Sequence, residues 1–317
     1  MPNTLIPNTF IQLAFQGKNQ WWRYLLGSLL TLFCFQIVGG IVSIGLLITY
    51  VLSDGNSTTA MLDSNSVGPA GLPVEGVAPL TLYVFLNLAF PFFLLGIYLA
   101  IKFFHGRSFR SLITPAKQVS WKRVLQGFVV FFGLKVIEIF VSYLLAPEDF
   151  TLNFQPQTFG LFVGLVFLFT PLQTATEELF CRGYLLQGIG SKLGPWMGIL
   201  LPSLLFTLMH LLNPEVQTQE NWQGVTSLVL YYFMVGAFLG WLTVKDKTLE
   251  LALGVHAANN MATFLLVTSP NSVIPSPAIF SVSELKADFS LLFITAIFLW
   301  LFSVIIFRVM KQPALAD

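Results

Sequence analysis

Eight apolar segments dominate the sequence, and each is close to the roughly 20 residues that a helix needs to cross a bilayer. Only 10% of the 317 residues are charged and 55% are hydrophobic, whereas soluble domains carry about 25% charged residues. The segments lack the short alternating pattern of a β-barrel. The sequence therefore predicts an all-α, polytopic membrane protein. The expected spans are 24–51, 79–101, 124–145, 159–188, 196–212, 224–244, 249–267 and 289–310.

Lysine and arginine concentrate in alternate loops, which sets the expected orientation. They lie before the first span, in or around the second, fourth and sixth loops, and after the last span, while the odd-numbered loops carry Asp and Glu. Because basic loops stay on the cytoplasmic side, both termini are predicted to be cytoplasmic. His105, in the basic second loop, is expected to be solvated. A net charge of +1 offers no basic face for nucleic acid, so we expect none as a partner.

Composition divides the chain near its middle. Residues 1–150 form a predicted N-terminal transmembrane region of three spans, with a long polar outer loop at 52–78 that is rich in Ser, Gly, Asn and Pro. Residues 151–317 form a C-terminal half with a final span, and this half holds most of the polar groups that lie inside apolar segments. Cys34 and Cys181 both fall in apolar segments, where packing as small buried hydrophobes is the simplest interpretation.

The fourth span contains the segment TATEELFCRGYLL, residues 174–186. Glu178 and Arg182 are four residues apart, so they share one helix face and can pair. Glu177 points about 100° away from Glu178, so its carboxylate remains available for a group on another helix. A charged group inside a bilayer is costly unless it is paired or hydrated, which makes these residues functional candidates. For Glu178 and Arg182, an ion pair that only stabilises the bundle is an equally good interpretation.

Two histidines in apolar segments are the candidates to meet Glu177. His210 follows Phe206 by four residues, and His256 precedes Asn260 by four residues near the start of the seventh span. From the rise per residue, Glu177 and His210 both lie roughly 20 Å from the turn between their helices. His256 and Asn260 are expected to be shallower unless their helix starts lower or tilts. The spacing permits these side chains to converge.

These residue types suit the hydrolysis of an amide bond. A carboxylate and an imidazole, here Glu177 and His210, can share a water and act as a general base. A neighbouring histidine and asparagine, here His256 and Asn260, can donate hydrogen bonds to an oxyanion, although interhelical hydrogen bonding without catalysis is an alternative. No HExxH zinc motif, GxSxG elbow or glycine-rich phosphate loop occurs, so hydrolases of those kinds and nucleotide enzymes have no support.

Three motifs, taken together and in this order, resemble the CPBP family (CAAX proteases and bacteriocin-processing proteins), also called the Abi family. They are Glu177-Glu178-xxx-Arg182, Phe206-xxx-His210 and His256-xxx-Asn260. The resemblance covers roughly residues 158–268 and implies a peptidase core. Family members are intramembrane endopeptidases of prenylated CAAX proteins, with bacterial relatives linked to bacteriocin maturation or self-immunity. The resemblance implies catalytic roles for Glu177, His210, His256 and Asn260, and supporting roles for Glu178, Arg182 and Phe206.

The resemblance leaves the metal and the partner open. Family members are commonly described as metalloproteases, and Glu177, His210 and His256 could bind zinc or another divalent metal. Because the three residues lie on three helices without a local pair of ligands, we expect a mechanism that requires no cofactor. The expected partners are the lipid bilayer and a membrane-embedded or lipidated protein substrate. The expected location is a prokaryotic plasma membrane or an organellar inner membrane.

Two other functions compete with an intramembrane endopeptidase. A non-catalytic membrane scaffold or immunity protein of the same fold would keep the helices without needing the carboxylate of Glu177. An ion-coupled or proton-coupled transporter would use Lys135 and Glu138, which lie three residues apart on one helix face. The sequence shows no internal repeat of the kind that many transporters have, and a neutralising ion pair is the simpler interpretation of Lys135 and Glu138.

Overall fold

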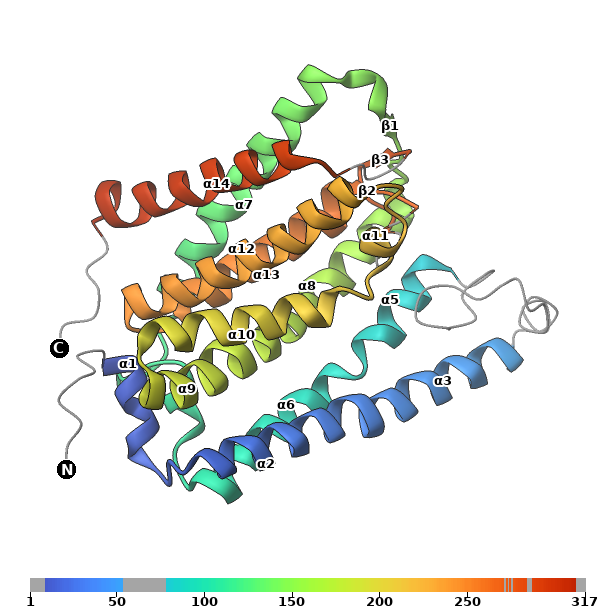
Figure 1. The fold of residues 1–317 in the computed structure, drawn as a ribbon. Coiled ribbons are helices and arrows are strands. Elements are labelled where there is room, and N and C mark those ends of the chain that lie inside the picture. The colour runs from blue at the N-terminus through green and yellow to red at the C-terminus, as the bar shows by residue number, and fades with distance from the viewer. Residues whose placement is uncertain are drawn as a thin grey trace.

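The computed structural model describes residues 9–53, 78–270, 272, 274, 276–283 and 287–311. Within these residues the chain is a bundle of long helices that occupy the predicted apolar segments (Figure 1). Most of the predicted polar outer loop, 54–77, lies outside the described residues. The first helix and the end of the last helix lie at the same end of the bundle (Figure 1). The predicted all-α fold is confirmed, and the cytoplasmic placement of both termini stays a prediction.

Six of the described helices are long and apolar enough to cross a membrane, and the predicted number of eight spans stays a prediction. The other two, α10 and α13, have 16 and 17 residues, fewer than the roughly 20 that a full crossing needs. Helix α10 begins at Pro195 and contains Pro202, and α13 carries polar side chains in its middle. The six are Trp21–Ser53, Pro79–His105, Trp121–Leu145, Pro156–Leu193, Trp222–Asp246 and Phe289–Val309.

Several of the long helices contain a π-helical segment, in which the turn is wider than in an α-helix. Four such segments occur in the described part of the chain, η2, η4, η7 and η8. The N-terminal half comprises α1 (Thr9–Gln12), η1 (Leu13–Gln16), α2 (Trp21–Leu32), η2 (Phe33–Gly39), α3 (Gly40–Ser53), α5 (Pro79–Asn87), α6 (Phe90–Leu99), η4 (Ala100–His105), η5 (Phe109–Leu112), α7 (Trp121–Leu145) and η6 (Pro147–Asp149). The C-terminal half comprises α8 (Pro156–Glu178), η7 (Leu179–Leu185), α9 (Leu186–Leu193), α10 (Pro195–His210), α11 (Pro214–Gln217), α12 (Trp222–Asp246), α13 (Glu250–Leu266), α14 (Phe289–Val304) and η8 (Ile305–Val309).

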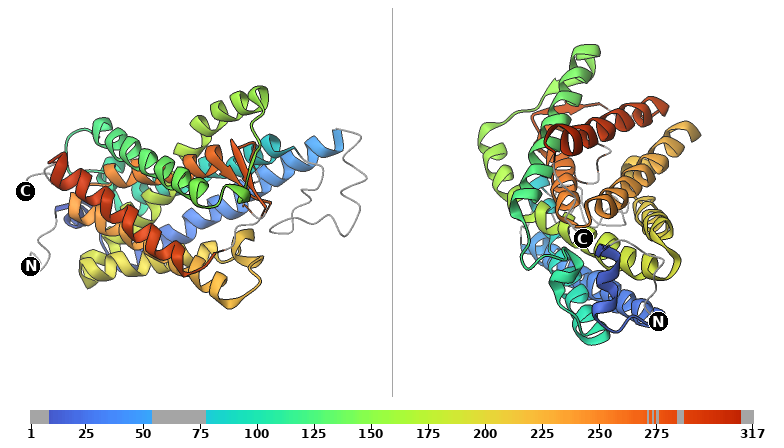
Figure 2. Two further views of the ribbon diagram at one scale, coloured as in Figure 1. Left: turned by 90° about the horizontal axis from the view of Figure 1, so that it is seen from above. Right: turned by 90° about the vertical axis from the view of Figure 1, so that its left-hand side faces the viewer.

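Helix α13 lies in the middle of the bundle, against α7, α8 and α12 (Figure 2). Two glycines allow α7 and α13 to approach closely. A Cβ atom on Gly127 would lie 2.6 Å from the carbonyl oxygen of Leu251, and a Cβ atom on Gly254 would collide with the carbonyl oxygen of Val124. Small residues at such crossings let helix backbones meet inside a membrane. The crossing therefore fixes α13 in place.

Three short strands close one end of the bundle. They are β1 (Phe150–Leu152), β2 (Val267–Thr268) and β3 (Phe280–Val282), in the order β1-β3-β2. Strand β3 pairs antiparallel with β1 and parallel with β2. Because β2 follows directly on α13, the sheet anchors the far end of that helix. These strands were not predicted from the sequence; they have only two or three residues each, and β1 pairs with residues more than a hundred positions away.

The N-terminal segment covers the basic loop that follows α6. His105 is 1% exposed, and its Nε2 and Nδ1 lie 2.9 Å from the Tyr184 hydroxyl and 2.8 Å from the carbonyl oxygen of Lys18. The prediction that His105 is solvated is therefore wrong. The sequence pattern placed it in a loop, but α1 and η1 fold back over that loop against α9.

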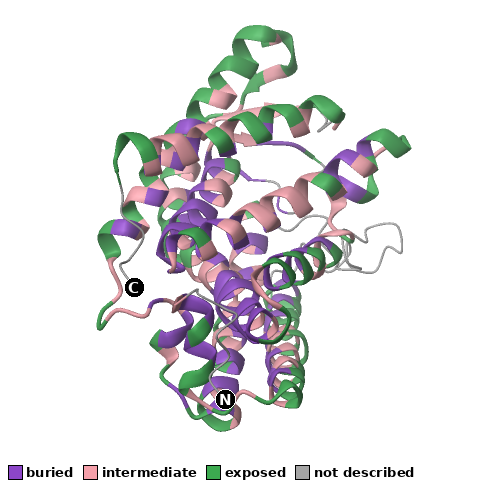
Figure 3. Cartoon of the chain, turned by 60° about the vertical axis from the view of Figure 1, so that its left-hand side comes forward, coloured by how far each residue is buried: buried purple, intermediate pink, exposed green. Residues whose placement is uncertain are grey.

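Large apolar side chains cover the outside of the bundle, as Figure 3 shows by the exposed residues on the outer helices. Ile41, Phe293 and Trp300, for example, are 69%, 73% and 62% exposed. Such a surface would aggregate in water but suits contact with lipid. With the six long helices, it identifies an integral, multi-pass membrane protein.

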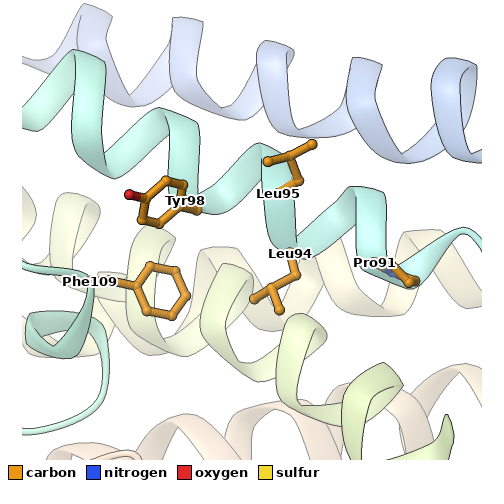
Figure 4. Close-up of a pocket in the computed structure, with 5 residues that line it drawn as sticks. All are labelled: Pro91, Leu94, Leu95, Tyr98 and Phe109. Carbon is orange, nitrogen blue, oxygen red and sulfur yellow. The ribbon is translucent and has the colours of Figure 1, made fainter.

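An apolar pocket of 340 Å³ opens beside α6 (Figure 4). It is lined by Pro91, Leu94, Leu95, Tyr98 and Phe109. This lining contains no acid, no imidazole and no metal ligand. The pocket therefore offers no hydrolytic chemistry, and the candidate site must be built from the polar groups between the helices.

Candidate functional site

The junction of α8 and η7 carries both glutamates and the arginine of the fourth predicted span. Glu178 and Arg182 are 0% and 1% exposed, and Arg182 Nη1 donates to Glu178 Oε1 at 2.6 Å. Arg182 Nη2 also donates to the carbonyl oxygen of Gly236 on α12, at 3.1 Å. The predicted pairing of Glu178 with Arg182 is confirmed. Arg182 also ties η7 to α12, which makes the pair part of the packing between helices.

Helix α13 places His256 beside both glutamates. Its Nδ1 lies 2.7 Å from Glu178 Oε1, and its Nε2 lies 3.6 Å from Glu177 Oε2. Since Glu178 Oε1 is a carboxylate oxygen that accepts from His256, Nδ1 must carry a proton. His256 is only 4% exposed. The ring is thus held between two carboxylates from a neighbouring helix, a contact that the helix spacing alone could not predict.

Helix α10 places Phe206 and His210 on the same side of the site. His210 Nδ1 lies 2.7 Å from the carbonyl oxygen of Phe206, so Nδ1 is the donor and Nε2 is left as an acceptor in the neutral ring. The Phe206 ring lies 4.2 Å from the His210 ring and 6.0 Å from the His256 ring. The Arg182 guanidinium lies 4.7 Å from the Phe206 centroid, a cation–π contact. Phe206 therefore packs between the charged pair and the two imidazoles.

Asn260 and its neighbour Asn259 lie one turn further along α13 than His256. The Asn259 amide nitrogen donates to Asn260 Oδ1 at 3.2 Å. This contact occupies the acceptor of the Asn260 amide and leaves its nitrogen as the donor that can face a substrate. Both asparagines are partly exposed, whereas His256 is buried. The site therefore becomes more open from His256 towards Asn260.

Glu177 does not contact His210 directly. Among the described residues no hydrogen bond or ion pair joins the two side chains, and the imidazole nearest to Glu177 is that of His256. The Gln173 side chain, one turn earlier on α8, hydrogen-bonds to Glu177. Both His210 and His256 were candidates to meet Glu177, with the shared water predicted at His210, and Gln173 was given no role. A water shared by Glu177 and His210 stays a prediction.

The sequence of this region matches a known family. Residues 156–262 match the family model described as type II CAAX prenyl endopeptidase Rce1-like. The chain carries an Rce1-like domain of the CPBP family. This domain begins with α8 and ends within α13, so it contains every residue named above for the site.

The similarity to one relative extends beyond the Rce1-like domain. Over 280 residues, which cover 87% of this chain and 88% of the relative, the sequence is 29% identical to the uncharacterized protein YyaK of Bacillus subtilis (strain 168). No solved structure matches the chain. The similarity between these two proteins therefore extends to N-terminal helices that lie outside the Rce1-like domain.

The side chains of the Rce1-like domain do not form a ready metal site. Within the described ranges, no group of three or more His, Cys, Asp or Glu side chains is placed to hold a metal ion. Glu178 Oε1 already accepts from Arg182 and His256, and His210 Nδ1 already donates to a carbonyl. The remaining donors, on Glu177 and on Nε2 of the two imidazoles, do not gather around one point as zinc requires.

The structure adds residues around His210 that the sequence analysis did not single out. Tyr232 of α12 lies 4.4 Å from the His210 ring, and its hydroxyl donates to Glu215. The charge pattern assigned Glu215 to an outer loop, but it is only 8% exposed. The sequence pattern does not indicate this burial, because a glutamate in a polar loop is normally solvated. The loop folds through the short helix α11, which places Glu215 against Tyr232 of α12.

Proposed function

We propose that this protein is an intramembrane endopeptidase that hydrolyses peptide bonds of membrane-associated or lipidated proteins. The observation that carries the proposal is that, in an Rce1-like domain, Glu177 lies 3.6 Å from the His256 ring and the Phe206 ring packs near both His256 and His210. Each imidazole has its Nδ1 committed to a protein acceptor, which directs the other nitrogen to the site. A structural bundle has no need of such an arrangement.

In the proposed reaction, Glu177 and the acceptor nitrogen of His210 bind a water. Glu177 takes a proton from this water as the oxygen attacks the peptide carbonyl carbon. Two donors then stabilise the oxyanion, the Nε2–H of His256 and the amide nitrogen of Asn260. When the C–N bond breaks, Glu177 returns the proton to the leaving nitrogen. Glu177 thus serves as base and then as acid.

His256 can play this part only with two protons on its ring. Its Nδ1–H is used by Glu178, so a second proton on Nε2 is required before the ring can donate to an oxyanion. Glu178 supplies the negative charge next to such an imidazolium, and Arg182 holds Glu178 in position. On this proposal, Glu178 and Arg182 act through His256 and not on the substrate.

A cleavage assay with the purified protein tests the proposal. Membrane-inserted and lipidated peptides are incubated with wild type, Glu177→Gln and His210→Ala. We expect either substitution to lower the rate by about 10²- to 10⁴-fold, because one removes the general acid–base group and the other removes the acceptor that holds the water for it. The matched control is Glu148→Gln, since Glu148 is exposed outside the site. Equal rates in all four proteins would reject the proposal and favour a scaffold or immunity protein of the same fold.

We also propose that water activation in this protein requires no metal, in keeping with the scattered ligands. Activity should then survive dialysis against EDTA and 1,10-phenanthroline. A loss of activity that added zinc restores would contradict this part of the proposal while leaving the peptidase intact.

The membrane of a prokaryotic cell is the location we propose, and immunoblotting of fractionated membranes tests it.

A further inference from the structure

His210 is held by contacts that lie outside the three family motifs. The ring centroid of Tyr232 is 4.4 Å from that of His210, with an angle of 33° between the ring planes. On its own helix, His210 is held by the hydrogen bond from Nδ1 to the carbonyl oxygen of Phe206 at 2.7 Å and by the Phe206 ring, whose centroid is 4.2 Å away. Both of these contacts come from one residue of α10. The Tyr232 ring supplies a second restraint from another helix.

Tyr232 is itself held by two polar residues that follow α10. Its hydroxyl donates to Glu215 Oε1, and the Asn213 amide nitrogen lies 3.1 Å from the same carboxylate oxygen and 3.3 Å from the tyrosine hydroxyl. Glu215 is buried, and no lysine or arginine of the described chain pairs with it. A buried carboxylate without a cation is costly. Its main interaction is therefore the one that orients Tyr232.

We propose that Tyr232 is a positioning residue, held by Glu215 and Asn213, that sets the plane of the His210 ring for water activation. This inference rests on the proposed peptidase function. A short path joins the anchor to the ring: Asn213 is only three residues from His210, and its backbone nitrogen donates to the His210 carbonyl oxygen at 3.1 Å. Asn213, in the segment after α10, thus contacts both His210, the last residue of α10, and Tyr232 of α12.

Kinetics with three substitutions test the inference. Tyr232→Phe keeps the ring but loses the anchor, so kcat should fall roughly five- to tenfold with KM unchanged. Tyr232→Ala removes the ring, and a misplaced imidazole should cost about 10²-fold in kcat. Glu215→Gln should match Tyr232→Phe, and the double variant should be no worse than either, because both remove the same interaction. Tyr143→Phe and Glu148→Gln, both away from the site, are the matched controls.

A second readout does not depend on catalysis. Diethyl pyrocarbonate modifies histidine rings, and mass spectrometry gives the rate at each position. Modification of His210 should rise several-fold in Tyr232→Ala, while that of the buried His105 stays constant and reports an intact fold. If wild type cleaves no substrate but this change appears, the peptidase proposal fails and the positioning role stands.

Three results would overturn the positioning role. The first is a kcat in Tyr232→Ala equal to that of wild type. The second is a rise in KM alone, which would place Tyr232 in contact with the substrate. The third is a fall in activity that Tyr143→Phe reproduces.

Discussion

Two buried clusters of charge in this protein have the same composition and differ in how completely they are paired. Each has one arginine and two carboxylates. In the first, in the candidate site, Arg182 pairs with Glu178, and His256 lies between Glu178 and Glu177. The second joins Arg123 of α7 to Asp246 and Glu250 at the turn between α12 and α13. Comparing them separates a cluster that holds the fold from one that is available for chemistry.

In the second cluster, three of the four carboxylate oxygens accept a clear hydrogen bond, and the fourth lies 3.5 Å from the arginine. The two oxygens of Asp246 accept from Arg123 and from the Thr248 hydroxyl, the latter at 2.7 Å. Glu250 Oε1 accepts from the backbone nitrogen of Ser120 at 2.7 Å, and Glu250 Oε2 lies 3.5 Å from Arg123 Nε. The contacts join α7, α12 and α13 at one end of the bundle. The cluster locks the turn and leaves no acceptor for a ligand.

In the first cluster, both glutamates are only partly paired, and the side chain that hydrogen-bonds to Glu177 is that of Gln173. Glu178 Oε1 accepts from both Arg182 and His256, while Glu178 Oε2 is buried without a partner among the described residues. The nearest ring nitrogen to Glu177 is 3.6 Å away, too far for a strong hydrogen bond. Buried polar groups are normally satisfied. The carboxylates of the first cluster can therefore still accept hydrogen bonds from water or substrate. This distinguishes the first cluster from the second, which holds the turn between α12 and α13.

The largest expected effect comes from Arg182→Met, which leaves the buried Glu178 without its arginine. We expect a loss of about 3–5 kcal/mol in stability together with complete loss of peptidase activity. Thermal unfolding can be followed with a thiol-reactive dye, since Cys34 and Cys181 are both buried in the folded protein. Arg308→Met, at an exposed position, is the control. An unchanged melting temperature would contradict the structural importance of the pair.

Arg123→Met should destabilise by about 3 kcal/mol, because it leaves two buried carboxylates without a cation. The activity of each folded molecule should stay within about twofold of wild type, since this cluster touches no residue of the site. The same dye assay and an activity assay normalised to folded protein measure the two quantities. A fall in normalised activity as large as that of Arg182→Met would erase the distinction between the clusters.

Gly254→Ala tests how the clusters are connected, because Gly254 lies between Glu250 and His256 on α13. The added methyl group meets the carbonyl oxygen of Val124 on α7, so we expect about 1–3 kcal/mol of destabilisation and a partial loss of activity. Gly133→Ala is the control, because a Cβ atom there meets nothing within 4 Å. Gly254→Ala with wild-type stability would show that the close crossing of α7 and α13 is dispensable.

The smallest effect should come from the third ion pair, Lys135 with Glu138, whose Nζ and Oε2 are 2.9 Å apart. The double variant Lys135→Met with Glu138→Gln removes both charges and should change stability by less than about 1 kcal/mol. It should also leave ion flux across liposomes at background. Flux that depends on Glu138 would revive the transporter alternative and make this pair a functional cluster.

Local spacing predicted what lies on one helix and failed where helices meet. The pairs Glu178–Arg182 and Lys135–Glu138 followed from helix periodicity and are confirmed. The contact of His256 with Glu178 depends on how α13 crosses α8, which sequence spacing does not specify. The burial of His105 depends on the N-terminal segment folding over a loop. Long-range packing decided each of these outcomes.

The π-helical segment η7 has a consequence for the evolution of this helix. A π turn holds one more residue than the α-helical turn around it, so deleting one residue from Leu179–Leu185 would restore regular geometry. Every side chain beyond the deletion would rotate by about 100°. Gln187 and Ser191, which hydrogen-bond to Ser111 of η5 and to Asn19 of the N-terminal segment, would turn away from their partners, while Glu177 and Glu178 would keep their direction. The extra residue therefore sets the angle, about the helix axis, between the part that bears the site and the part that carries Gln187 and Ser191. Any deletion or insertion between these two parts would change that angle.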